Sequence, residues 1–310
     1  MNAAWVAGSV RSVALARRRL DRDGVREIAA SSSSSAAIAS VARSSYGHDV
    51  RAEFDLADAE HAVAATVLWN ARVLAGWLPA AGVTQLRLLA GWFEVANVDT
   101  HMDTLDTVSP ATPAPMFQLG HLATAWPHLA TTGSIADLRA ALAASAWGDP
   151  GAGTSRDISL FMRLSWADRV ASGVPLARPW AAGAAALVVA RERFAAGRAL
   201  PAAAAARARR LLGASHAGTT TLDDFTRSLP AESRWSLSGL TEPTDLWRAE
   251  ARWWGRLHRD GATLLRRSGV GPHRPLGAAA LLAADAWQTA VALQIAGHGG
   301  GGREVLDEGA

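Results

Sequence analysis

Two groups of histidine and acidic residues are the first candidates for chemistry in this chain. His101 and Asp103 stand close together and could contribute ligands to a metal ion. The segment lacks the pair of histidines four residues apart that puts two imidazoles on one helix face. A solvated helix face therefore explains it more simply. His121 and His128 are seven residues apart, but Pro127 interrupts the helix between them, which favours surface or capping positions for both.

A pair of adjacent carboxylates is the second candidate. Asp223 and Asp224 resemble the start of the Asp-rich helix with which all-α terpene synthases bind metal ions. The third acidic position of that motif is missing, and no partner motif of Asn, Ser and Glu follows. Thr221 precedes the pair, and a Thr cap followed by acids suits the positive end of a helix dipole. A helix start is the favoured interpretation, and a metal-dependent all-α enzyme remains a lesser alternative.

Several catalytic classes lack their essential residues. The chain has no Lys, so a phosphate-binding loop of the Gly-Lys-Ser/Thr type is excluded, and with no Cys there is no thiol nucleophile. A Gly-x-Ser-x-Gly elbow is also absent. Tryptophans and arginines are interleaved in one segment, where they could stack nucleobases or pack by cation–π contacts, and packing is favoured. These residues are Trp247, Arg248, Arg252, Trp253, Trp254 and Arg256. We therefore expect no catalytic site, cofactor or metal.

Composition bounds the remaining classes. All 31 basic residues are Arg, which is typical of a GC-rich genome, and the net charge is only +3 although the pI is about 10.6. Because the very high pKa of Arg sets that pI, it does not indicate nucleic-acid binding. The hydrophobic content is 49%, yet no stretch of about 18 residues lacks charges or turn formers. The chain also lacks the pattern of a secretory signal. We expect a cytoplasmic protein with no membrane span.

The apolar spacing predicts an all-α fold. In the segment 55–78, Val63, Val67, Leu74 and Leu78 share one helix face. Three prolines within 109–115 cannot continue a helix and predict a module boundary. Helices are expected over 10–20, 23–30, 36–43, 55–78, 83–105, 159–171, 180–196, 202–212, 220–229, 244–267 and 276–296, with a helix pair within 122–147.

A loose internal repeat suggests that these helices form related modules. The segment Ser40–Asp49 and the segment Ala140–Asp149 share a pattern of small residues, an aromatic residue, Gly and Asp. Each follows a turn of Ser, Thr or Gly, and the serine run 31–35 is expected to be such a turn. The order of helices recurs a third time. The sequence therefore predicts three modules in pseudo-threefold arrangement, at 1–109, 117–198 and 199–298, with a flexible tail at 299–310.

The sequence also resembles a known family. The opening Trp5–Ser12 with Arg18-Arg19-Leu20, the segment Val41–Tyr46 and the segment Glu94–Val98 resemble motifs of the C subunits of V-type/A-type ATPases. That family is the prokaryotic relative of the d subunit of eukaryotic V-type ATPases. The chain departs from it where Trp5 replaces a Tyr and where an Asn is missing near Gly8. The resemblance covers the first hundred residues by motif and most of the chain by the order of modules.

The resemblance implies a mechanical function. In that family, the C subunit is a funnel of three helical modules. It links the central stalk to the membrane rotor ring and transmits torque in ion transport, and it has no catalytic site. The resemblance implies a peripheral place at the inner face of the plasma membrane, where Arg-rich surfaces would suit an acidic stalk tip. Arg11, Arg18, Arg51 and Arg72 are the expected interface residues. A Trp-rich helical binding or regulatory protein without a rotor is the main alternative.

Overall fold

The computed structural model describes residues 3–106, 115–151, 153–299 and 304–309, and all regular secondary structure in these ranges is helical. The predicted all-α fold is confirmed, and the pseudo-threefold arrangement stays a prediction. The chain divides into two compact units: Met1–Leu86 with Trp254–Ala310, and Arg87–Trp253. The three predicted module ranges stay a prediction. Of the proline-rich segment expected at the first boundary, all but Pro115 lies outside the described residues.

Short polar residues fix where many helices begin. Ser, Thr and Asp favour such positions because their side chains accept a backbone N–H that no helical carbonyl can reach. The serine run illustrates this, because Ser33 Oγ accepts the N–H of Ala36 at 3.2 Å and the helix starts at Ser34. The side chains that cap helices in this way are Asp21, Ser33, Asp55, Ser134, Thr154 and Thr221.

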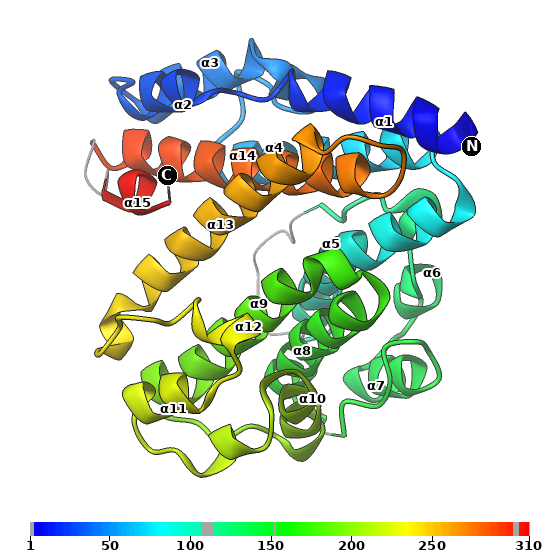
Figure 1. Ribbon diagram of the computed structural model, residues 1–310, viewed down its shortest axis with the longest axis vertical. Coiled ribbons are helices and arrows are strands. Elements are labelled where there is room, and N and C mark those ends of the chain that lie inside the picture. Colours follow the sequence, from blue (N-terminus) through cyan, green and yellow to red (C-terminus); the bar gives the residue numbers. More distant parts are fainter. Residues whose placement is uncertain (1–2, 107–114, 152, 300–303, 310) are drawn as a thin grey trace. The chain divides into compact units, whose positions relative to one another are not determined.

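The first unit is built around one long helix, α14 (His273–Gly297), which contacts α1, α2, α3 and α4 (Figure 1). Pro275 is tolerated in its first turn, where a backbone N–H has no helical acceptor. The other elements of the unit are α1 (Ala3–Ala16), α2 (Arg22–Ala29), α3 (Ser34–Ala42), η1 (Ser45–His48), α4 (Leu56–Ala75), the first turns of α5 (Ala80–Leu105), the later turns of α13 (Leu246–Arg266), and α15 (Glu304–Glu308).

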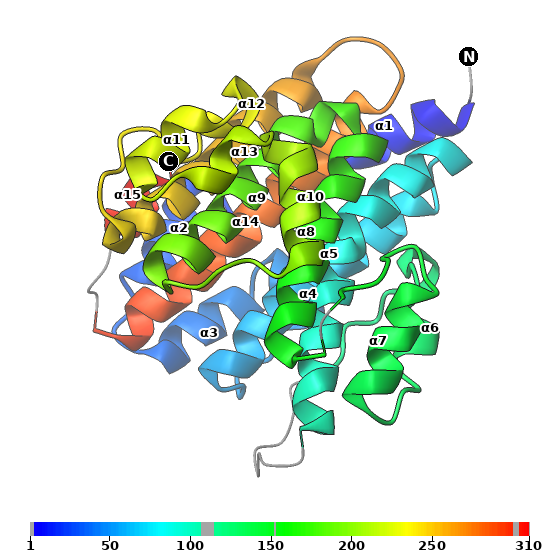
Figure 2. The same cartoon turned by 90° about the horizontal axis from the view of Figure 1, so that it is seen from below.

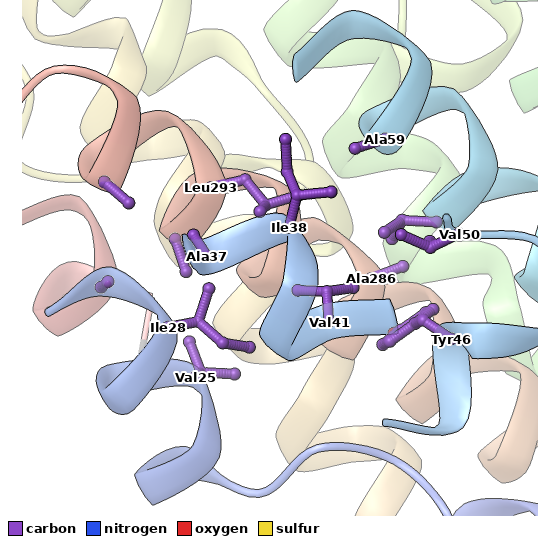
Figure 3. Close-up of a cluster of buried hydrophobic side chains, with 14 of the residues drawn as sticks. Val25, Ile28, Ala37, Ile38, Val41, Tyr46, Val50, Ala59, Ala286 and Leu293 are labelled. Carbon is purple, nitrogen blue, oxygen red and sulfur yellow. The ribbon is translucent and has the colours of Figure 1, made fainter. Parts of the chain in front are cut away.

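The core of this unit gathers β-branched and small side chains. Figure 3 shows Val25 and Ile28 of α2 and Ile38 of α3 lying near Leu293 of α14. All four are at most 3% exposed. Val63 on α4 belongs to the same cluster, as its predicted helix face requires. Burying side chains of this size contributes roughly 1.5–3 kcal/mol each, so the cluster is what holds the helix pair α2–α3 onto α14.

Helix α14 is also long and apolar enough to cross a membrane, by length and composition alone, and it is the one such helix in the described part of the chain. Of its most apolar window, 61% is buried inside the protein. The core helix of a soluble protein passes the same test, so the finding is weak evidence for a span.

The second unit packs alanine-rich helices around tryptophan rings. Helix α8 contacts both α9 and α10 (Figure 2). A Cβ atom at Gly183 of α9 would lie 2.7 Å from Trp235 and 3.2 Å from Trp253, so these rings fill the space that small residues leave. The elements of this unit are the rest of α5, η2 (Gly120–Leu122), α6 (Trp126–Leu129), α7 (Ile135–Ala143), α8 (Ser155–Gly173), η3 (Pro175–Ala177), α9 (Arg178–Ala190), the π-helical turn η4 (Arg191–Ala195), α10 (Ala202–Leu212), η5 (Ser215–Gly218), α11 (Leu222–Ser228), α12 (Ala231–Arg234), η6 (Pro243–Asp245) and the start of α13.

The flexible tail predicted at 299–310 stays a prediction, and the structure describes residues 299 and 304–309 of it. Helix α15 occupies part of the segment expected to be flexible. Leu306 packs against the core of the first unit, and Gly309 O lies 2.6 Å from the position that a Cβ of Gly255 would occupy. An apolar residue in an otherwise acidic segment gives the tail this anchor.

Candidate functional site

A buried carboxyl group on α14 forms the centre of the candidate site. Asp285 is 2% exposed, and its Oδ2 accepts the Tyr46 hydroxyl at 2.7 Å and the Leu20 N–H at 3.1 Å. Tyr46 belongs to η1, directly after α3, and Leu20 precedes Asp21, the cap of α2. One oxygen atom therefore joins the start and the end of the helix pair α2–α3 to the long helix.

Burial dominates the electrostatics of this group. It raises the pKa of Asp285 to about 7, although the bonds from Tyr46 and Leu20 and the nearby charge of Arg19 act in the opposite direction. Burial, followed by the charge of Asp285, also raises the pKa of Tyr46 well above its ordinary value. The tyrosine therefore stays a hydrogen-bond donor at physiological pH, while the aspartate changes charge there.

A cavity of about 270 Å³ in the first unit adjoins the pair. The Oδ1 atom of Asp285 accepts no hydrogen bond from the part of the chain that the structure describes. A carboxyl that titrates near neutral pH beside such a cavity can exchange its proton with solvent there. The lining residues are Leu15, Arg18, Arg19, Ser45, Tyr46, Thr66, Val67, Trp69, Asn70, Leu282 and Asp285.

A second buried carboxylate, in the other unit, also joins two short helices to a long one. Glu94 of α5 is fully buried. Its oxygens accept the Thr124 N–H at 2.6 Å, the Ala125 N–H at 2.8 Å and the Trp147 Nε1–H at 2.7 Å. The guanidinium of Arg169 lies over the Trp147 ring, 4.6 Å from its centroid. Ala125 is the residue just before the first turn of α6, and Trp147 follows α7. Glu94 therefore joins the start and the end of the helix pair α6–α7.

We call this arrangement the carboxylate clamp: Asp285 with Leu20 and Tyr46, and Glu94 with Thr124, Ala125 and Trp147. In each clamp, a buried carboxyl group on a long helix accepts a hydrogen bond from a backbone N–H at the start of one short helix. It accepts another from an aromatic side chain that follows the second short helix of the pair.

The aromatic donors of the two clamps are positioned alike. Ser44 Oγ donates to Val41 O at 2.7 Å and accepts the N–H of Tyr46 at 3.2 Å. Ser145 Oγ donates to Leu142 O at 2.8 Å and accepts the N–H of Trp147 at 3.1 Å. The loose sequence repeat therefore corresponds to shared local geometry.

A third helix junction carries the opposite charge. Arg193, in the π-helical turn after α9, donates Nη1 to His216 O at 2.8 Å and Nη2 to Thr219 O. Both carbonyls lie before Thr221, the cap of α11. Burial, together with the charges of Arg193 and Arg209, lowers the pKa of His216. In the clamps, a carboxyl group accepts hydrogen bonds from backbone N–H groups. At this junction, a guanidinium donates hydrogen bonds to backbone carbonyls instead.

Asn97, one turn after Glu94, fixes a further segment. Its Oδ1 accepts the Phe117 N–H at 2.7 Å, and its Nδ2 donates to Phe117 O at 2.9 Å. Glu94 and Asn97 both belong to the segment on which the family resemblance rests. Their side chains hold the backbone in place and are 0% and 1% exposed.

The four predicted interface arginines all lie in the first unit. Arg11 and Arg18 are on or just after α1, Arg72 is on α4, and Arg51 follows η1. Arg18 is exposed and lines the cavity, whereas Arg11 and Arg72 are half-buried. The Arg51 side chain donates to the carbonyls of Gly47, His48 and Val50 and so closes a turn. Their role as a partner interface stays a prediction.

The predicted surface character of the histidines is correct in part. His121 and His128 are exposed, as expected. His101 is 8% exposed, and its Nε2 lies 3.0 Å from Thr132 Oγ1. The expectation of a solvated position is therefore wrong for His101, because the turn before α7 covers it, while Asp103 beside it is exposed.

The acidic pair lies at a helix start, and the tryptophan segment packs against other rings and backbone, as the favoured interpretations predicted. Thr221 caps α11, and Arg227 pairs with Asp223 at 2.9 Å and Asp224 at 2.6 Å on the surface. Trp253 is buried and donates Nε1 to Trp180 O at 2.9 Å. In the other unit, Trp254 stacks on Trp287 with centroids 5.7 Å apart. Arg248 lies over the ring of Trp247.

Within the described ranges, no group of three or more His, Asp or Glu side chains could hold a metal ion. No protein-family model matches the chain, and none of the curated proteins matches it either.

Sequence reasoning missed Asp285 and Trp147 as members of the clamps. The signal for Asp285 was present, since it is the sole acidic residue in the 25-residue helix α14. An acid in a helix that is otherwise apolar is buried with a partner or marks a function.

Proposed function

We propose that this chain is a non-catalytic central-stalk coupling subunit of a rotary V/A-type ATPase. It would link the rotor stalk to the membrane ring and transmit torque during ion transport, at the inner face of the plasma membrane. One observation carries the proposal. Tyr46 and Glu94 belong to the segments that resemble the family, and each is a member of one of the two carboxylate clamps. The residues that resemble the family are thus the ones that fix how helices are joined.

A protein that couples rotation needs stiff helix junctions, and the clamps supply them. Each clamp gives a backbone N–H at a helix start a buried carboxyl oxygen as its acceptor, which fixes the short helix relative to a long one. In the second unit, close packing of Trp235 and Trp253 on Gly183 leaves little room for helix sliding. Tightly packed interiors transmit strain rather than absorb it.

The distribution of charge suits acidic partners. Arg11 and Arg18 lie on or just after α1, a helix without any acidic residue. Arg51 and Arg72 add cations to the same unit. We propose that these arginines face an acidic stalk tip or the polar loops of the membrane ring, where complementary charge sets orientation and the rate of association.

Co-purification tests the proposal directly. The full chain, tagged at its chromosomal locus, is isolated from membranes in a mild detergent, and the proteins that accompany it are identified by mass spectrometry. We expect stalk and ring subunits of a rotary ATPase in fixed stoichiometry. Recovery of the chain without any such protein would refute the proposal.

A charge-reversed variant sharpens that test. Arg11→Glu combined with Arg18→Glu should reduce recovery of stalk or ring subunits. Arg227→Glu is the matched control, because Arg227 is an exposed arginine whose surface pairs with Asp223 and Asp224 contribute little to stability. Equal losses for the test and the control variant would contradict the assignment of these two arginines.

A further inference from the structure

Helix α1 presents an apolar face to solvent. Its buried face consists of Gly8, Ser9, Ser12, Leu15 and Ala16, and Arg11 is the only charged residue among its 14 residues. Val6 is 42% exposed and Val10 is 65% exposed. Ala3 and Ala14 are exposed as well, and with the two valines they follow the three- and four-residue spacing of a single stripe. A surface helix ordinarily carries charged and polar residues on that stripe.

An exposed tryptophan belongs to the turn on which α1 packs. Trp77, in the turn after α4, is 51% exposed. Helix α1 lies directly on that turn, because a Cβ at Gly8 would approach the Leu78 side chain and lie 3.3 Å from the Trp77 carbonyl oxygen. Trp5 packs against Gly82, where its ring lies 3.0 Å from the position of a Cβ. Tryptophan favours the boundary between water and hydrocarbon, because its ring is apolar and its N–H is polar.

Arginines flank the stripe. Arg17 and Arg18 are exposed just beyond the last turn of α1, and Arg19 donates to Ala16 O at 2.7 Å. No acidic residue lies within α1. Exposed apolar side chains next to flanking arginines are two features that α1 shares with helices that lie in a membrane interface. Arginine stems can cover apolar surface while their guanidinium groups reach lipid phosphates.

We propose that the α1 surface, which comprises Ala3, Val6, Val10, Ala14 and Trp77 with Arg11, Arg17 and Arg18, binds the surface of a bilayer that contains anionic lipids. The valines and Trp77 enter the boundary between head groups and acyl chains, and the arginines bind the acidic head groups. The helix lies in the plane of the interface and does not cross it. The proposal shares Arg11 and Arg18 with the proposed rotary-ATPase interface, but it also rests on the exposure of Val6 and Val10, so Val10→Glu tests it apart from that assignment.

Vesicle co-sedimentation tests the proposal with the purified full chain. The probes are vesicles of phosphatidylcholine alone and vesicles with about 30% phosphatidylglycerol, at low and high salt. We expect binding to the anionic vesicles, with weaker binding at high salt and to neutral vesicles. Val10→Glu should weaken binding to anionic vesicles by about tenfold or more, because it removes apolar burial and adds repulsion. Neutralising Arg17 with Gln should weaken it about fivefold.

Val270→Glu is the matched control for the valine variant. Val270 is 44% exposed and lies between α13 and α14, outside helix α1. It should bind vesicles as the natural protein does, and circular dichroism should show all variants folded. Absence of vesicle binding, or equal losses for Val10→Glu and Val270→Glu, would overturn the proposal. A dimer that forms without lipid and is abolished by Val10→Glu would assign the surface to a second copy instead.

Discussion

Replacing Asp285 with Asn should change how the stability of the protein depends on pH. The Asn carboxamide oxygen can take the place of Oδ2 and accept both the Leu20 N–H and the Tyr46 hydroxyl. Its NH₂ group then occupies the position of Oδ1, beside the cavity. The substitution therefore keeps the clamp and removes only the titrating proton.

The sign of the effect follows from the raised pKa of Asp285, about 7 in the folded protein against an ordinary value of 3.8. Between these two values the folded state binds more protons than the unfolded state. The contribution of this group to stability is therefore fully present below pH 3.8 and is lost as the pH rises to about 7. At about 1.4 kcal/mol for each pH unit of the interval, the natural protein should lose about 3 kcal/mol relative to Asp285→Asn between pH 5 and pH 8.

Urea denaturation at several pH values measures this difference. Other groups titrate in both proteins, so the difference between their free energies of unfolding isolates Asp285. We expect the free energy of unfolding of Asp285→Asn, relative to that of the natural protein, to rise steadily from pH 5 and to level off above about pH 7. Parallel stability curves for the two proteins would show that Asp285 is ionised at both ends of the range, and the reasoning about its burial would fail.

Two further substitutions test the clamps and the packing. Trp147→Phe removes the indole N–H that Glu94 accepts and should lower the free energy of unfolding by about 1–3 kcal/mol, whereas Trp126→Phe, at a half-buried position outside the clamps, should cost less on urea denaturation. Gly183→Ala places a Cβ 2.7 Å from Trp235, so we expect a loss of about 1–3 kcal/mol and altered tryptophan fluorescence; unchanged stability would mean that the rings can move apart.

Most helices could be predicted from local sequence because their signals are local. Apolar spacing predicts helix 55–78, which the structure has as Leu56–Ala75 with Asp55 as its N-cap. Helix α1 begins earlier than expected, at Ala3 and not at residue 10. Its first turns lack the charged face that marks a surface helix, and Gly8 lowers helix propensity. Gly8 lets α1 pack closely on the turn after α4, where a Cβ would meet the Leu78 side chain and lie 3.3 Å from the Trp77 carbonyl oxygen.

The clamps could not be predicted from the sequence because their partners are far apart along the chain. Leu20 and Asp285 are separated by 265 residues, and Glu94 and Trp147 by 53. Local patterns place Tyr46 and Trp147 after short helices, but they do not say which long helix lies opposite. The expectation for His101 is wrong for a similar reason, since its cover comes from Thr132 in another segment.

The clamps also explain why polar groups are kept in cores that are otherwise apolar. An N–H at a helix start has no partner within its own helix, and leaving it buried and unpaired costs about 1–3 kcal/mol. The N–H groups of Thr124 and Ala125 precede the first turn of α6 and have no acceptor within that helix, so Glu94 supplies the acceptor from another helix. At the third junction, Arg193 satisfies carbonyls instead. The sign of the charge differs because N–H groups need a partner in the clamps and carbonyl groups need one at the third junction. In each case the hydrogen bond fixes where a short helix begins relative to a long one. Such directional bonds determine the positions of helices that smooth alanine surfaces alone would leave free to slide.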